Sequence, residues 1–471
     1  MKKVLKIAAV TSLLLTSKAL VWGPGRSAPY GQDSPAPRNS QQVAGLRVGA
    51  AAEEFQADDS MVIGGGIEPG KAQGQEGKLR AVAVVAEKPP FGKLAIVSCD
   101  VLMLTRDLLD PVAAEIERTT GIPRDHILIS ATHTHHAPST VTVHGYERDE
   151  TFCRRVQRGI VIAVQEANGQ LAGSECRFYF HLGQEGTVGQ NSRLLLSDNT
   201  IYWIGPRGDA VRPTGPFDPE LPVLAFRDST DRLRALIFNH STHSIGTRCG
   251  KCRSPSFYGL AAQEMEEQLG GTVCFLEGAS GSTHNLELST DTAVKRIEAA
   301  VQGALRRVEL HPVTRLQAVR QAFKFKVRSF NEAQEDAMVS SYCKKRAAAN
   351  APYIIEVFRK QRRILAPLQG QDRETWLQVM AIGDVAIVGV PGEFFTGLGK
   401  EIKRRSPFRY TYIAELANDW IGYLPDEEAF RLGGYQTWTG LHSYSEPGTG
   451  ERIVDESVKM LKQLADAPVH P

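Results

Sequence analysis

The segment from residue 94 to residue 132 constrains the fold more than any other part of the chain. The short apolar run Leu94–Val97 is typical of a buried strand, and apolar residues at helical spacing predict a helix over 106–120. Gly121 follows this helix and is a common helix stop. A second apolar run predicts a strand over 127–132. A strand, a helix and a second strand at this spacing form a βαβ unit, so part of the sheet is expected to be parallel.

Other segments carry the same two patterns. Residues 376–382 and 385–390 are both strand-like and are separated only by Gly383 and Asp384, which predicts an antiparallel hairpin. The fold is therefore expected to be α/β, with a mixed β-sheet core and flanking helices. Further helices are expected over 150–168, over 259–269, over most of 331–365 with a break near Pro352, up to about Arg405, and over 453–464, and further strands over 79–85, 176–182, 235–238, 272–276, 314–327 and 410–416.

The strand over 127–132 runs into three histidines within four positions, His133, His135 and His136. If the strand continues through Thr134, His133 and His135 point to the same face, because side chains alternate along a strand. Two imidazoles on one face are a natural start for a metal site, since neutral imidazole is a common zinc ligand. The alternative is a polar strand end with solvated histidines, and this stretch alone leaves both interpretations open.

Further strand ends carry residues that can bind metal. The strand over 235–238 is followed by His240 and His243, the hairpin by Glu393, and the strand near 410–416 by a loop with Tyr423. A catalytic zinc ion commonly takes three protein ligands and keeps one position open for water. Two histidines and one carboxylate form such a set, and a zinc site at the strand ends is therefore expected. Spacing alone does not show that these side chains converge.

Four motifs in this order resemble the neutral ceramidase family, also described as neutral/alkaline non-lysosomal ceramidases. They are ATHTHHAP, NHSTHS, PGEFFT and IGYLP followed by GGY, and FDPELPVLAF and FYGLAAQEM fit as well. The resemblance extends from about Val48 to about Leu464 and covers the family's catalytic domain alone. It implies an exported zinc hydrolase that cleaves the amide of an N-acyl sphingoid base such as ceramide. The cofactor would then be Zn²⁺ and the substrate a lipid amide, with a peripheral membrane contact left open.

The resemblance also implies a ligand set. His133 and His240 match the two histidine ligands of the family, and Glu393 matches its acidic ligand. Tyr423 matches the tyrosine that completes the zinc shell. Two further histidines, His136 and His243, are expected to be solvated or to support a ligand.

Five other residues correspond to the catalytic positions of the family, two of them with departures. His135 matches the histidine that contacts the substrate, and Tyr435 matches a second active-site tyrosine. The arginine of an Asn-Arg-Ser-like stretch is displaced by one position, to Arg193. The serine of a GDVSPN-like loop is replaced by His284, with Ser282 nearby. These departures leave open a hydrolase of the same fold that acts on another amide or ester, and a non-catalytic binding homologue.

The N-terminal sequence predicts where the protein is located, and the net charge bears on its partners. Three lysines precede an apolar run from Ile7 to Leu15, which predicts a secretory signal peptide over 1–22. Residues 23–45 are rich in Pro, Gly, Ser and Gln and are expected to form a disordered linker, before a catalytic domain over 46–471. The protein is thus expected in the periplasm or outside the cell. The net charge of +2 includes no long basic block, so nucleic acid is not an expected partner.

Seven cysteines leave at least one unpaired within the chain. Cys249 and Cys252 have the CxxC spacing of redox and zinc sites, but no second CxxC completes a four-cysteine site. A local disulfide or two idle thiols are favoured over a redox centre.

Overall fold

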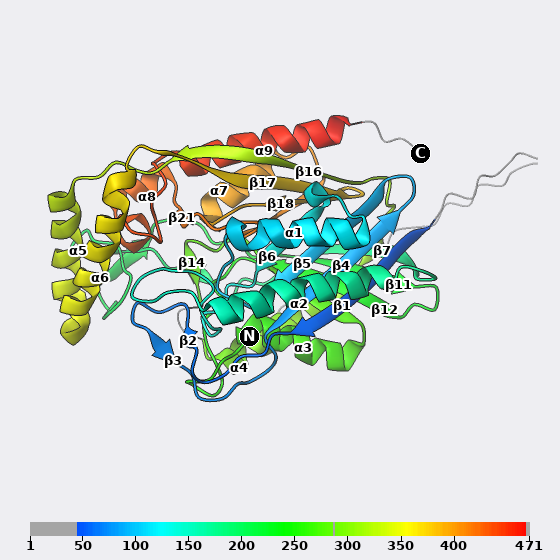
Figure 1. Cartoon of the computed structure of the whole chain (residues 1–471), viewed down its shortest axis with the longest axis horizontal. Helices are drawn as coiled ribbons and strands as arrows, with labels where there is room; N and C mark the ends of the chain where they lie inside the picture. The colour runs from blue at the N-terminus through cyan, green and yellow to red at the C-terminus, as the bar shows by residue number, and fades with distance from the viewer. Residues whose placement is uncertain (1–44, 286–287, 468–471) are drawn as a thin grey trace, which may run out of the picture. The chain divides into compact units, whose positions relative to one another are not determined.

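The computed structural model describes residues 45–285 and 288–467, and it contains two β-sheets that pack face to face (Figure 1). Among these residues the larger sheet has the strand order β13-β12-β11-β7-β1-β4-β5-β6, with β15 paired to β7. Its strands are β1 (Leu46–Glu54), β4 (Arg80–Lys88), β5 (Gly92–Cys99), β6 (Ile127–Ala131), β7 (Glu175–Gln184), β11 (Glu220–Asp228), β12 (Leu233–His240), β13 (Thr272–Glu277) and β15 (Glu309–Leu310).

Two crossover helices make this sheet mixed. Helix α1 (Arg106–Thr120) joins β5 to β6, and these two strands pair in parallel. Helix α3 (Ser256–Leu269) joins β12 to β13, which are parallel as well. The neighbouring pairs β1–β4, β4–β5, β7–β11 and β11–β12 are antiparallel. The expected α/β class with a mixed sheet is therefore confirmed.

The smaller sheet has the order β16-β17-β18-β20. The hairpin of β17 (Asp372–Ile382) and β18 (Val385–Gly389) turns at Gly383, whose φ of +62° suits glycine. Helix α7 (Thr396–Arg405) then leads to β20 (Tyr410–Ala414), which pairs with β18 in parallel. The remaining strand, β16 (Leu316–Lys326), pairs with β17 along its whole length.

The central strands are buried on both faces. In β4, Ala81, Ala83 and Val85 face α1 and α2 (Glu150–Gly169), while Val82 and Val84 face the second sheet. A strand covered on both sides needs apolar residues at every position, which explains the unbroken apolar run in this part of the sequence. Between the sheets, aromatic and aliphatic side chains from both form one core: Leu128, Phe178, Phe226, Met380, Ile387 and Tyr412.

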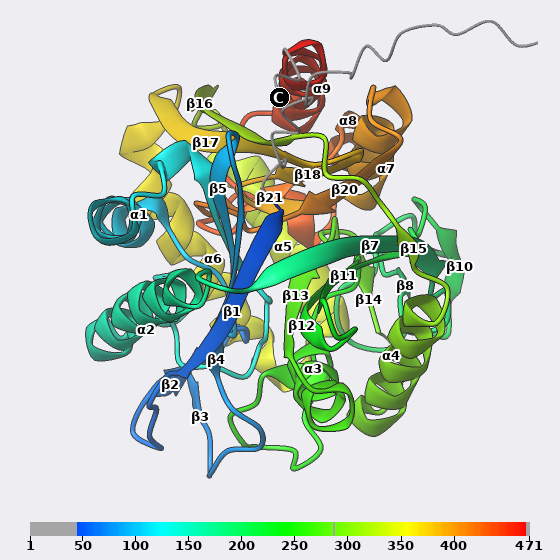
Figure 2. The same ribbon diagram turned by 90° about the vertical axis from the view of Figure 1, so that its right-hand side faces the viewer.

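Helices cover the outer faces of both sheets (Figure 2). Besides α1, α2 and α3, helix α4 (Thr290–Leu305) covers the larger sheet, and α7 and α9 (Thr449–Asp466) cover the smaller one. Helices α5 (Glu332–Arg346) and α6 (Ala351–Leu365) form a hairpin at one end of the molecule (Figure 1). No helix in the described part of the chain is long and apolar enough to cross a membrane.

Short elements fill the loops between the layers. Three of them, β14 (Thr283–His284), β19 (Glu393–Phe394) and β21 (Tyr423–Leu424), carry residues of the site described below. The others are β2 (Val62–Ile63), β3 (Gly70–Lys71), β8 (Gln190–Asn191), β9 (Leu194–Leu196), β10 (Ala210–Pro213), α8 (Glu427–Leu432) and the 3₁₀ turns η1 (Arg124–His126), η2 (Ala348–Asn350), η3 (Ala366–Leu368) and η4 (Tyr435–Thr437). Cys249 and Cys252 form a disulfide. The expected signal peptide and all but the last residue of the expected linker lie outside the described residues.

Candidate metal centre

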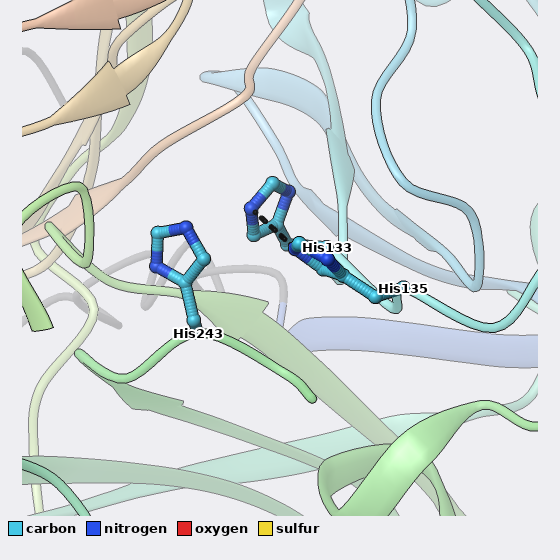
Figure 3. A group of neighbouring side chains, drawn as sticks. All are labelled: His133, His135 and His243. Carbon is cyan, nitrogen blue, oxygen red and sulfur yellow. Dashed lines mark hydrogen bonds between the residues drawn. The ribbon is translucent and has the colours of Figure 1, made fainter. Parts of the chain in front are cut away.

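Three imidazoles meet from two loops, one after β6 and one after β12. His133, His135 and His243 each place a ring nitrogen within 4.8 Å of the others (Figure 3). The Nε2 atoms of His133 and His135 are 3.2 Å apart. His133 and His243 are at most 1% exposed, and His135 is partly exposed. His135 is therefore the one member of the group that solvent reaches.

The loop after β6 does not continue as a strand. The strand ends at Ala131, and His133 has a φ of +59°, in the left-handed region. The expectation that alternation along a strand aligns His133 with His135 is therefore wrong, although both rings do reach the same point. A hydrogen bond from the His135 N–H to the Ser244 carbonyl, 3.3 Å long, ties this loop to the loop that carries His243. Left-handed non-glycine residues cost about 1–3 kcal/mol and cluster at functional sites.

In all three rings, the partner of Nδ1 determines which nitrogen carries the hydrogen. Each Nδ1 faces a backbone carbonyl, which can only accept a hydrogen bond, so each Nδ1 carries the proton. Each Nε2 then presents a lone pair, and those lone pairs face one another. Outer hydrogen bonds of this kind are what fixes the tautomer of metal-binding histidines. The carbonyls belong to Leu102 for His133 (2.9 Å), Gly65 for His135 (3.1 Å) and Ser280 for His243 (2.9 Å).

A carboxylate and a phenol complete the group. Glu393 Oε2 lies 3.6 Å from His133 Nε2 and 3.4 Å from His243 Nε2. The hydroxyl of Tyr423 is 3.1 Å from His243 Nε2. Glu393 and Tyr423 face each other across the parallel β19–β21 pair, and the Trp420 indole donates a 3.2 Å hydrogen bond to Glu393 Oε1. Four strand ends, after β6, β12, β18 and β20, thus deliver one set of nitrogen and oxygen donors.

The electrostatics of the group favour neutral His133 and His135 rings beside an ionised carboxylate. Burial, reinforced by His243, lowers the pKa of His133 to about 4. Burial works against ionisation of Glu393, but the neighbouring His243, His133 and Tyr423 outweigh it and lower the pKa of this carboxyl to about 2. Converging lone pairs repel one another unless a cation lies among them. Neutral imidazole nitrogens and a carboxylate oxygen are ligands that zinc prefers, so the residues fit a zinc ion.

The structure brings His243, rather than His240, to His133 and Glu393. His240 is the last residue of β12 and points toward α3, where its Nδ1 is 2.5 Å from the Tyr258 hydroxyl. Its Nε2 lies 2.9 Å from the backbone carbonyl of Glu185. The chain turns after His240, and this turn carries His243 to the centre.

Two of the other predicted site residues, His284 and Tyr435, border the centre, and His136 supports a neighbouring loop. The ring of His284 stacks on His243 with centroids 4.1 Å apart, and burial together with His243 holds the pKa of His284 well below its usual range. The Tyr435 ring contacts Tyr423 edge-on, with centroids 5.7 Å apart. The Nε2 of His136 accepts a 2.9 Å hydrogen bond from the Gly246 N–H, which supports the loop after β12.

Two predicted catalytic residues point elsewhere. Ser282 Oγ lies 3.2 Å from both the N–H and the hydroxyl of Thr396, at the start of α7. The buried guanidinium of Arg193 donates 2.7 Å hydrogen bonds to Gln436 Oε1 and to the Gly433 carbonyl. Arg193 thus holds the loop on either side of Tyr435 rather than the metal group.

A buried glutamate, which the sequence analysis did not single out, ties the ligand loops together. Glu415 Oε2 accepts hydrogen bonds from the N–H groups of Ser280 (3.0 Å) and Phe394 (2.8 Å), and Oε1 accepts one from the Ser280 hydroxyl (2.6 Å). The same Ser280 supplies the carbonyl that orients His243, and Phe394 follows Glu393. Burial raises the pKa of Glu415, and of its neighbour Glu277, well above the usual range. A glutamate at the end of the apolar strand β20 was the available sequence signal.

Solved structures similar to this chain include two ceramidases, although no family model and no curated protein matches its sequence. One is a neutral ceramidase from Pseudomonas aeruginosa, with a TM-score of 0.67 and 18% identity over 89% of this chain and 74% of that protein. The other is a ceramidase complexed with C2, with a TM-score of 0.68 and 16% identity over 91% of this chain and 76% of that protein. The chain therefore has a neutral ceramidase-like fold, as the motifs predict.

Proposed function

We propose that this protein is a zinc-dependent amide hydrolase that cleaves N-acyl sphingoid bases, ceramide among them, to a fatty acid and a sphingoid base. One observation carries the proposal. Within a neutral ceramidase-like fold, three imidazoles whose Nδ1 atoms face backbone carbonyls turn their Nε2 atoms toward one another beside the ionised Glu393. A metal ion held by such a donor set can polarise an amide carbonyl and activate a water molecule for its hydrolysis.

In this proposal His133, His243 and Glu393 hold the zinc ion, and Tyr423 completes the shell. When bound, zinc supplies Lewis acidity that makes water a nucleophile near neutral pH and polarises the amide carbonyl. Leu102, Ser280 and Trp420 already orient the three ligands, so their side chains need little rearrangement when the metal binds.

The remaining residues handle protons and charge. His135 is the group's partly exposed imidazole, and its free Nε2 can accept the proton that the attacking water releases and pass it to the leaving sphingoid amine. A phenol at Tyr423 or Tyr435 can donate a hydrogen bond to the oxygen on which negative charge develops. Removing one such donor typically costs about 10²–10³ in rate. His284 covers one face of His243 and keeps water from that side.

The cellular setting belongs to the same proposal. The lysines and the apolar run at the N-terminus favour export to the periplasm or beyond. A substrate with two hydrocarbon chains resides in membranes, so the enzyme would approach a bilayer peripherally.

The test is hydrolysis of a fluorescent N-acyl sphingosine, beside a simple fatty amide and a fatty ester, by zinc-loaded and chelator-treated protein. We expect the zinc-loaded protein to prefer the sphingosine amide and the chelated protein to lose this activity. His181→Ala, which removes an imidazole on β7 away from the centre, is the matched control and should keep it. Turnover of only the simple amide or the ester would point to another substrate. Bound zinc without turnover of any of them would favour a binding homologue and contradict the proposal.

A further inference from the structure

The hydroxyl of Tyr435 is held by an imidazole from a distant loop. Tyr435 Oη lies 3.0 Å from His144 Nε2. The other ring nitrogen, His144 Nδ1, lies 3.3 Å from the amide nitrogen of Gln361 on α6. The Gln361 Oε1 in turn accepts a 2.7 Å hydrogen bond from the backbone N–H of Leu441. Four residues from three regions of the chain therefore form one chain of hydrogen bonds that ends at the Tyr435 phenol.

The direction of every bond in this chain is determined. The Leu441 N–H can only donate, so the oxygen of Gln361 faces it and the NH₂ of Gln361 faces His144. An NH₂ group cannot accept, so His144 Nδ1 accepts. Burial and the neighbouring His442 hold the pKa of His144 well below its usual range, and the ring is neutral. A neutral imidazole whose Nδ1 accepts carries its proton on Nε2, and this proton is donated to the Tyr435 oxygen.

The phenolic hydrogen of Tyr435 is consequently left for another acceptor. Within residues 45–285 and 288–467, no second hydrogen-bond partner contacts this hydroxyl. The Trp203 ring stacks parallel on Tyr435 with centroids 4.5 Å apart, and the Tyr423 ring contacts it edge-on. Tyr435 is 9% exposed, so its ring is held by packing.

The backbone of His144 indicates that this arrangement is maintained at a cost. His144 has a φ of +57°, in the region that non-glycine side chains rarely adopt, and asparagine tolerates best. Packing alone would be served by a residue without this strain. Strained residues persist where the surroundings fix them for function.

We propose that His144 and Gln361 are positioning residues that make Tyr435 a hydrogen-bond donor to the polar head of the bound N-acyl amide. His144 occupies the acceptor side of the phenol, so the O–H hydrogen points at the substrate oxygen instead of at the protein. The substrate named in this inference rests on the proposed function, whereas the directions of the hydrogen bonds do not depend on it.

Two substitutions of His144 separate positioning from folding. In His144→Gln the side-chain NH₂ can take the place of Nε2 and still donate to Tyr435. In His144→Asn the shorter amide lies near the place of Nδ1 and cannot reach the phenol. The left-handed backbone favours asparagine, so a purely structural role predicts that His144→Asn is the better variant. Positioning predicts the opposite order in kcat.

The measurements are kcat and KM on the N-acyl sphingosine for both variants, for Tyr435→Phe and for the double variant His144→Asn/Tyr435→Phe. We expect His144→Asn and Tyr435→Phe each to lower kcat by about 10²-fold, as loss of one donor does, and His144→Gln to stay within several-fold of wild type. The double variant should be no slower than Tyr435→Phe, because His144 acts through that phenol. Zinc content should equal that of wild type throughout. An asparagine variant as fast as the glutamine variant, or a further loss in the double variant, overturns the inference.

A second readout needs no activity. Long-range ¹H–¹⁵N spectra of protein labelled at histidine distinguish the two neutral tautomers, and the signals lost in His144→Gln identify His144. The expected form carries the proton on Nε2. A proton on Nδ1 overturns the inference even if the protein hydrolyses ceramide, whereas the Nε2 form in a protein that cleaves no amide would sink the proposed function alone.

Discussion

Replacing Glu415 tests how the ligand loops are held together. Glu415→Ala removes the acceptor for the N–H groups of Ser280 and Phe394 and for the Ser280 hydroxyl. A buried donor left without a partner costs about 1–3 kcal/mol, so the two backbone groups alone cost about 2–6 kcal/mol. The hydroxyl can rotate toward another acceptor and adds little. Since domains are typically stable by only about 5–15 kcal/mol, this loss is large.

The loss should extend to metal affinity. Ser280 orients His243 through its carbonyl, and Phe394 adjoins Glu393, so both ligands lose support when Glu415 is truncated. Loss of outer partners usually weakens metal binding by about 10–100-fold. The assay is urea unfolding of the metal-free protein, followed by zinc titration against a chromophoric chelator. Glu415→Gln is the matched control, because an amide keeps an acceptor oxygen for the backbone N–H groups.

The buried pair Glu415 and Glu277 should make the stability of the protein depend on pH. Burial raises the folded-state pKa values of Glu415 and Glu277, so folding keeps protons that the unfolded chain releases above the ordinary glutamate value of 4.5. This contribution to stability is fully present below 4.5 and is lost as the pH rises through the folded-state pKa. Glu415→Gln removes one such group, so its free energy of unfolding should fall less steeply with rising pH than that of wild type. If Glu415→Gln is as unstable at pH 7 as Glu415→Ala, the carboxyl is needed ionised and the reasoning is refuted.

Three further predictions concern other parts of the chain. Tyr423→Phe should keep the fold and lower kcat by about 10²-fold, because only one oxygen beside His243 is lost; unchanged turnover of the N-acyl sphingosine would make this tyrosine a packing residue. Burial raises the pKa of Asp100 to about 7 from 3.8, so up to ~4 kcal/mol of its contribution should disappear between about pH 4 and pH 7, and urea unfolding of Asp100→Asn should lack that decline. N-terminal sequencing of exported protein should find a start between about Ala19 and Ser27, and a retained Met1 would contradict the signal peptide.

Elements that depend on local pattern were predictable. Helix α1 has the predicted bounds, because apolar spacing and a left-handed Gly121 specify it locally. The break in 331–365 lies at 347–350, near Pro352 as predicted, and Pro352 itself is accommodated in the first turn of α6. Strand β11 was not predicted as an element, since Pro222 within it argues against a central strand. Helix α4 was not predicted, although Ser289 caps it and its apolar residues recur at helical spacing.

Local sequence patterns could not predict that the site residues converge. Sequence placed His133, Glu393 and Tyr423 near strand ends, but only the pairing of the strands brings those ends together. Motif matching selected His240 from NHSTHS, whereas the turn after β12 decides which of the two histidines faces the centre. His144 comes from a loop with no motif of its own, and its partner Gln361 lies on a helix 217 positions away. Contacts of this length are set by tertiary packing.

The most direct measurement is zinc content by mass spectrometry for wild type, His243→Ala and His240→Gln. The account predicts about one zinc ion per wild-type chain, by the usual stoichiometry of a catalytic site. His243→Ala should lose it, and His240→Gln should retain it, because glutamine can still donate to the Glu185 carbonyl. Zinc retained in His243→Ala but lost from folded His240→Gln, or a wild-type protein that binds no zinc, would contradict the centre described here.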